Sequence, residues 1–98
     1  MPTPTRPHLA MDRHVADAIA LEGLAFLAQD RARMAQFLAL SGLHGGQLRA
    51  LLGTRELALA VLEHLAADES LLLVFSQSHA IPPQRIQPAI LLLSAAEQ

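Results

Sequence analysis

Residues 21–48 read LEGLAFLAQDRARMAQFLALSGLHGGQL, and this stretch decides the fold of the chain. Its first leucines recur at steps of three residues, which places them on one face of a helix. Asp30 follows, and its short side chain suits the N-cap of the next helix. Gly42 stands where a left-handed residue closes a helix. The stretch therefore predicts a first helix that ends near Ala28, a second over 31–40 and a third that begins after a glycine corner.

The same pattern returns 38 residues later, as the spacing of Asp30 and Asp68 and of Phe37 and Phe75 shows. The other matches pair Leu21, Leu24, Leu27, Ala28, Leu43 and Leu48 with Leu59, Leu62, Leu65, Ala66, Ile81 and Ile86. A fixed period indicates a duplicated unit, here three helices repeated about a pseudo-twofold axis. A chain rich in leucine and alanine also aligns with itself by chance, so both interpretations stay open.

Composition agrees with a helical domain. The 98 residues are 52% hydrophobic but only 3% aromatic, with no Trp or Tyr, so the core must be aliphatic. Leucine and alanine favour helix, and β-branched residues are few and scattered. The sequence therefore predicts an all-α fold, a compact bundle of five or six short helices. The expected helices cover residues 11–28, 31–40, 46–52, 55–67 and 69–78, with a sixth that begins at Pro83.

The chain is expected to hold one domain, residues 10–98, behind a short tail. Residues 1–9 contain three prolines and no apolar period, which predicts a disordered N-terminal segment. The N-terminus lacks the continuous apolar core of a signal peptide, and no run reaches the ~18 apolar residues of a membrane span. The absence of cysteine excludes disulfides. These features favour a cytoplasmic protein without a membrane-spanning segment.

The last predicted helix contains a proline and an unusual apolar run. Pro88 removes a backbone donor, so we expect the helix either to bend there or to start afresh at that residue. The run Ile90, Leu91, Leu92 and Leu93 is apolar on all sides of a helix, whereas a terminal helix on a small domain buries only part of its circumference. Part of this run should therefore remain uncovered and form a partner surface.

Several segments together resemble a small bacterial family, the domain of unknown function 3572. They are Ala25-Phe26-Leu27-Ala28, Asp30, Phe37-Leu38, Ser41-Gly42-Leu43, Leu48-Arg49, Asp68-Glu69, Leu72 and Phe75. The resemblance implies a compact helical protein, found mainly in alphaproteobacteria, without an established activity and without catalytic residues to carry over. The sequence departs from the family pattern at Arg31, Ala80 and Pro88, where proline, glycine and an uninterrupted helix are usual.

Chemically reactive side chains do not form a recognisable motif. His64 and Asp68 lie four residues apart, but Asp68 is better explained as a helix cap, and the other histidines show no metal-ligand spacing. Ser76, Ser78 and His79 are close in sequence without the elbow or oxyanion hole of a hydrolase. The glycines after His44 lack the lysine of a phosphate loop. We therefore expect no catalytic site, no bound metal and no cofactor.

The corner from Gly42 to Arg49 supports a nucleic-acid alternative. It is similar to a helix-turn-helix corner, with Gln47 and Arg49 on the second helix and Arg55 nearby. The formal net charge of −2 gives no general attraction to phosphates, so this alternative is disfavoured.

The leading functional hypothesis is a non-enzymatic protein-interaction module, which uses Ile90 to Leu93 to bind a protein partner or to form a homodimer. The first alternative is a weak nucleic-acid-binding module. The second is a small-ligand binder or enzyme with an apolar cavity between the two halves of the chain.

Overall fold

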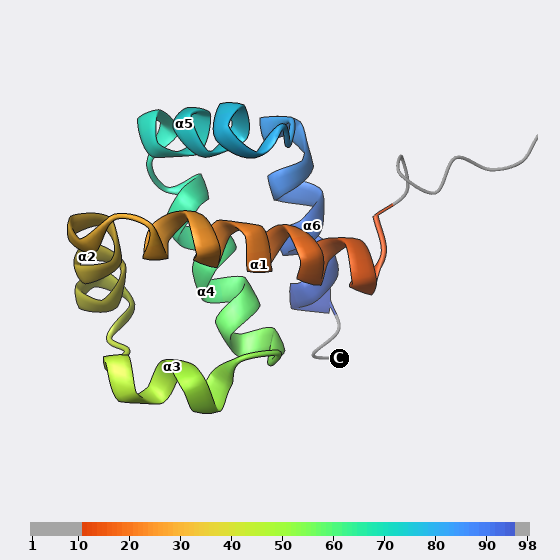
Figure 1. Cartoon of the computed structure of the whole chain (residues 1–98). Coiled ribbons are helices and arrows are strands. Elements are labelled where there is room, and N and C mark those ends of the chain that lie inside the picture. Colours follow the sequence, from red (N-terminus) through yellow and green to blue (C-terminus); the bar gives the residue numbers. More distant parts are fainter. Residues whose placement is uncertain (1–10, 96–98) are drawn as a thin grey trace, which may run out of the picture.

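The computed structural model describes residues 11–95 of the chain, and its elements there are helical (Figure 1). The six α-helices are α1 Arg13–Ala28, α2 Arg31–Ser41, α3 Gly45–Leu51, α4 Arg55–Ala66, α5 Glu69–His79 and α6 Ile86–Ala95, and a 3-10 turn covers Pro83–Arg85. The predicted all-α class is confirmed, and the helix ends lie within two residues of those expected for the first five helices. The predicted disordered segment, residues 1–9, lies outside the described residues.

Short polar side chains fix where three helices begin. Asp30 and Asp68 each accept a hydrogen bond from the backbone N–H three residues further on, at N···O distances of 3.1 Å. Thr54 does the same for the N–H of Leu57 at 3.2 Å. These bonds satisfy N–H groups that have no partner inside the helix. The caps predicted at Asp30 and Asp68 are confirmed.

Left-handed residues close α2 and α5. Gly42 has φ 78° and Ala80 has φ 55°, and each donates its N–H to a carbonyl of the last helical turn. Both helices contain 11 residues, and their caps lie 38 residues apart. The helix boundaries thus follow the period of the sequence match, while duplication of the chain itself stays a prediction.

Pro88 does not start the last helix. The 3-10 turn of Pro83–Arg85 leads directly into α6, which begins at Ile86, so Pro88 is the third residue of the α-helix. N–H groups in the first turn have no intrahelical acceptor, so a proline there removes no hydrogen bond. The α-helix therefore continues through Pro88.

Two crossed helices form the centre of the molecule. Helix α1 crosses α4, α6 packs against both, and α2 and α5 pack beside the ends of this pair (Figure 1). The crossing is close at Gly23, where a Cβ atom would lie 2.9 Å from Val61 Cγ1 and from Leu65 Cδ1. The largest fully buried side chains are Phe26, Phe37, Phe75, Leu27, Leu62, Leu65, Ile86, Leu93 and Val61. The absence of a side chain at Gly23 thus permits the close approach of α4.

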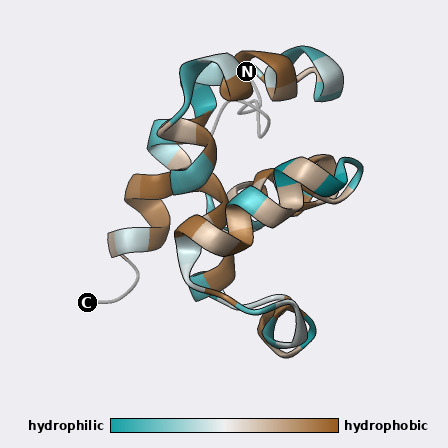
Figure 2. Cartoon of the chain, turned by 90° about the vertical axis from the view of Figure 1, so that its left-hand side faces the viewer, coloured by the Kyte–Doolittle hydropathy of each residue, from teal (hydrophilic) through white to brown (hydrophobic). Residues whose placement is uncertain are grey.

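Helix α3 is the least embedded element of the described chain. It contains no buried residue and packs mainly against α4. It lies at the lower edge of the molecule in both views (Figures 1 and 2). No helix between residues 11 and 95 is long and apolar enough to cross a lipid bilayer.

Candidate functional site

The predicted partner surface on α6 is divided between the core and the solvent. Ile90 and Leu93 are buried, Leu92 is half-buried, and Leu91 is 60% exposed. Ile90 and Leu93 share the helix face that packs on α1 and α4, which the apolar run alone could not identify. They are therefore not available to a partner, and Leu91 is the open position of the run.

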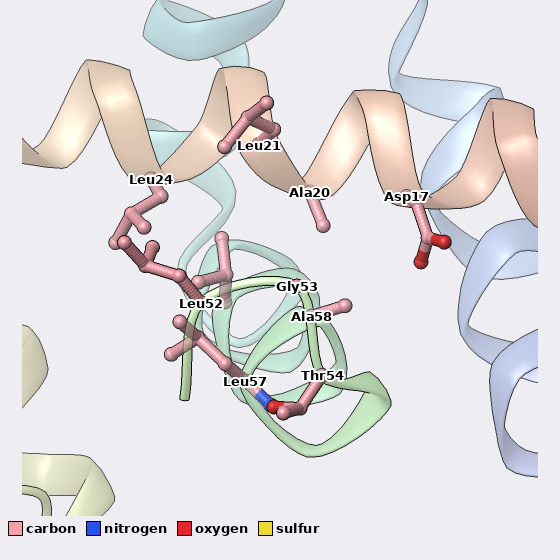
Figure 3. Close-up of a pocket in the computed structure, with 10 residues that line it drawn as sticks. Asp17, Ala20, Leu21, Leu24, Leu52, Gly53, Thr54, Leu57 and Ala58 are labelled. Atoms are coloured by element: carbon pink, nitrogen blue, oxygen red, sulfur yellow. The ribbon is translucent and has the colours of Figure 1, made fainter. Parts of the chain in front are cut away.

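An apolar pocket lies instead between α1 and α4, and we call it the α1–α4 pocket (Figure 3). Its lining residues are Asp17, Ala20, Leu21, Leu24, Leu52, Gly53, Thr54, Leu57, Ala58 and Val61. Its volume is about 140 Å³, well below the ~300–1,000 Å³ of sites for drug-sized ligands. An apolar cavity of about 150 Å³ holds a group the size of benzene. The α1–α4 pocket therefore suits one or two apolar side chains.

Two large apolar side chains at the rim of the α1–α4 pocket are exposed to solvent. Leu21 is 63% exposed and Leu52 is 51% exposed, although both border a surface made of buried residues such as Leu57 and Val61. Figure 3 shows Leu24 and Leu52 approaching each other at one end of the pocket, with Asp17 at the other end. Covering such leucines is favourable by roughly 1.5–3 kcal/mol for each fully buried side chain.

The polar groups of the α1–α4 pocket already have partners. The Thr54 hydroxyl donates to the Leu51 carbonyl at 2.6 Å and accepts from the Leu57 N–H. Asp17 pairs with Arg13 at 3.1 Å, and the two side chains are 41% and 50% exposed, respectively. A charge pair in that setting is weak, so a partner's cation can compete for Asp17. The chemistry of the pocket is apolar contact with one acidic end.

The corner from Gly42 to Arg49 places its three candidate side chains in different surroundings. The Gln47 side chain accepts the backbone N–H of His44 at 2.9 Å, so its carbonyl oxygen serves as part of the helix cap. Arg49 is exposed on α3, whereas Arg55 is half-buried in the first turn of α4. The three side chains predicted for this corner therefore differ in role, and Arg49 is the exposed cation among them.

His64 lies between α4 and α2 and contacts an aromatic ring. Its ring meets that of Phe37 edge-on, with centroids 5.2 Å apart. Burial lowers the pKa of His64 below 6.5, while the nearby Asp68 carboxylate acts in the opposite direction. Among residues 11–95, no group of three His, Asp or Glu side chains is placed to hold a metal ion. His64 and Asp68 thus remain a pair, and Asp68 caps α5 as the sequence predicted.

His79 packs in an aromatic cluster and bonds a carboxylate. Its Nδ1 lies 2.5 Å from Glu22 Oε1, and its ring contacts Phe26 and Phe75. A histidine bound to a carboxylate is two-thirds of a hydrolase triad, but the buried Ser76 hydroxyl makes no hydrogen bond to it. The pair instead joins α5 to α1.

Arg33 extends the same cluster from α2. Its guanidinium carbon lies 4.7 Å from the centroid of the Phe26 ring. The Arg33 side chain is half-buried because it covers this ring. The cation and the aromatic residues thus hold α2 and α5 against the end of α1.

The second alternative from the sequence named an apolar cavity between the two halves of the chain but none of its lining residues. The lining of the α1–α4 pocket could not be named because it comes from helices that are distant in the chain. One local signal lies near it: Gly23 stands inside the first helix, where a glycine permits close approach of another helix. This signal does not identify the second helix.

Comparison with known proteins gives a family but no activity. The sequence model of the family described as protein of unknown function (DUF3572) matches residues 13–96. The chain matches no curated protein and no solved structure. The family resemblance predicted from the sequence is confirmed.

Proposed function

Because the chain belongs to the DUF3572 family, whose description names no activity, we propose a function from its own geometry: it is a non-enzymatic module that binds another protein through the α1–α4 pocket. The observation that carries the proposal is the exposure of Leu21 and Leu52 around an apolar pocket. Exposed leucines beside a concave apolar surface are typical of protein-binding sites.

Pocket size favours a protein side chain over the small-ligand alternative. A volume of about 140 Å³ takes one or two side chains. The non-enzymatic part of the proposal is supported by the hydrogen bonding of Glu22, His79 and Ser76, which does not link a nucleophile to a base. The proposed setting remains the cytosol, as the sequence suggested.

The test is site-specific photo-crosslinking in living cells. A benzophenone amino acid replaces Leu21, and matched variants carry it at Leu73 on α5 and at Leu91 on α6, which are also exposed. We expect a discrete adduct of higher mass from position 21 that survives nuclease treatment, and none from position 73. An adduct from position 91 but not 21 would move the binding surface to α6. Failure of all three positions to capture a protein would contradict the proposal.

A further inference from the structure

Two aromatic contacts relate the halves of the molecule. Phe37 of α2 packs on His64 of α4, and Phe75 of α5 packs on Phe26 of α1, with centroids 5.2 and 5.4 Å apart. Adding 38 to Phe37 gives Phe75, and subtracting 38 from His64 gives Phe26. When a twofold axis exchanges the two halves of a molecule, each contact between elements maps onto an equivalent contact, as these two contacts do.

The position of that axis follows from the helix crossing. Gly23 faces Val61, and these two residues are 38 apart. A residue touches its own counterpart only at a twofold axis, so the axis passes through the crossing of α1 and α4. It exchanges α1 with α4, α2 with α5, and α3 with the 3-10 turn and α6.

The α1–α4 pocket has a counterpart under this exchange. Its residues Leu21, Leu24 and Leu52 correspond to Leu59, Leu62 and Ile90, and Ile90 belongs to α6. Leu62 is fully buried where Leu24 is half-buried, and Ile90 is 8% exposed where Leu52 is 51% exposed. The counterpart of the pocket is thus the surface that α6 covers, while the pocket itself is open.

Helix α3 cannot fill the pocket as α6 fills its counterpart. It contains 7 residues against 10 in α6, and Gly53, at φ 83°, then turns the chain into α4. No residue of α3 lines the pocket, and the chain reaches its edge only after the helix has ended, at Leu52, Gly53 and Thr54. The position corresponding to Leu93, the last buried leucine of α6, is Arg55, which is already part of α4.

We infer that the α1–α4 pocket is the part of this binding surface that α3, the counterpart of α6, leaves uncovered, and that it receives an amphipathic helix of another protein. This inference rests on the proposed function and specifies its partner. The helix carries aliphatic residues spaced as Ile86, Ala89, Ile90 and Leu93 are in α6, the i, i+3, i+4, i+7 pattern of helices that bind in grooves. A lysine or arginine of the partner faces Asp17, the charged residue of the pocket lining.

A second copy of this chain offers no suitable helix in its described part. Apart from Leu21 and Leu52, the exposed large apolar residues are Leu40, Leu73, Val74 and Leu91, and they belong to three different helices. None of these helices has a free face with the required spacing. The occupant is therefore assigned to a different protein.

The test uses the chain's own sixth helix as the probe. A fluorescent peptide with the sequence of residues 83–95 and the change L91K, which adds a cation at an exposed position, is titrated into the intact protein. We expect saturable binding, with NMR shifts confined to pocket residues such as Leu24, Leu52 and Thr54. We expect Leu21→Glu to weaken binding at least tenfold, while the matched Leu73→Glu leaves it unchanged.

Three outcomes would overturn the inference: no binding at millimolar peptide, shifts at α6 itself through exchange of the helix, or equal effects of Leu21→Glu and Leu73→Glu. Mapping the photo-adduct of position 21 separates this inference from the proposed function. An adduct on a non-helical partner segment, or on a second copy of the chain, refutes the helix but leaves the interaction module standing. Absence of any adduct refutes the module itself.

Discussion

Gly23 is the residue on which the central helix crossing depends. A methyl group there would lie 2.9 Å from Val61 Cγ1 and Leu65 Cδ1, inside their van der Waals contact. Alanine gains about 1 kcal/mol of helix propensity, but overpacking of a core costs roughly 1–3 kcal/mol. We expect Gly23→Ala to lower the free energy of unfolding by about 1 kcal/mol in urea denaturation, because the stiff Val61 side chain cannot move aside.

A matched control for this substitution is available in α3. Gly46 is also helical, but a Cβ atom there meets open space. Gly46→Ala should therefore raise stability by a few tenths to about 1 kcal/mol through helix propensity alone. If Gly23→Ala stabilised the protein as much as Gly46→Ala does, the close crossing of α1 and α4 would be wrong.

His64 makes stability depend on pH in a defined direction. Since burial lowers the pKa of His64 in the folded chain, the unfolded chain binds the proton more readily. Neutral His64 contributes to the free energy of unfolding above pH 6.5. This contribution is lost as the pH falls from 6.5 through the lowered pKa, and below that pKa the free energy of unfolding no longer changes on account of His64. The variant His64→Phe keeps a ring against Phe37 but cannot titrate. The free energy of unfolding, measured by urea denaturation from pH 8 to 5, should decline less in the variant than in the natural protein. Parallel declines in the two proteins would contradict this account.

At the scale of single elements, the left-handed residues that close α2 and α5, Gly42 and Ala80, differ by one methyl group. Gly42 adopts φ 78° without strain, but Ala80 at φ 55° places its Cβ close to the backbone. We expect Ala80→Gly to raise the free energy of unfolding by about 0.5–1 kcal/mol, and Gly42→Ala to lower it by about 1 kcal/mol. Thermal and urea denaturation of the two variants measure these shifts, and opposite signs would show that these residues do not close the helices as described.

The elements themselves could be predicted because their signals are local. Asp30, Thr54 and Asp68 mark helix starts through bonds to N–H groups three residues away, which the sequence shows directly. The faces of α6 could not be predicted, because Ile90 to Leu93 are apolar all round and only packing on α1 and α4 selects the buried ones. The residues that line the α1–α4 pocket could not be predicted for the same reason, since its two walls meet only in the folded chain.

At the scale of the whole molecule, stability should be distributed unevenly. Helix α3 has no buried residue and packs mainly on α4, whereas α6 packs on both central helices. Local opening is easiest where few apolar contacts are lost. We expect the amides of α3 to exchange with deuterium well before those of α1, α4 and α6, as followed by mass spectrometry of peptic fragments. Equal protection of α3 and α6 would contradict the asymmetry between the halves.

The place of α6 in the chain has a consequence for synthesis. Helix α6 covers both central helices, yet it is the last of the described helices to leave the ribosome. Until it emerges, the nascent protein displays two open apolar surfaces where the finished protein keeps one. Exposed apolar surface is what chaperones bind and what drives aggregation. In the interval between the emergence of α5 and the emergence of α6 from the ribosome, the core formed by α1 and α4 is therefore open to aggregation and to chaperones.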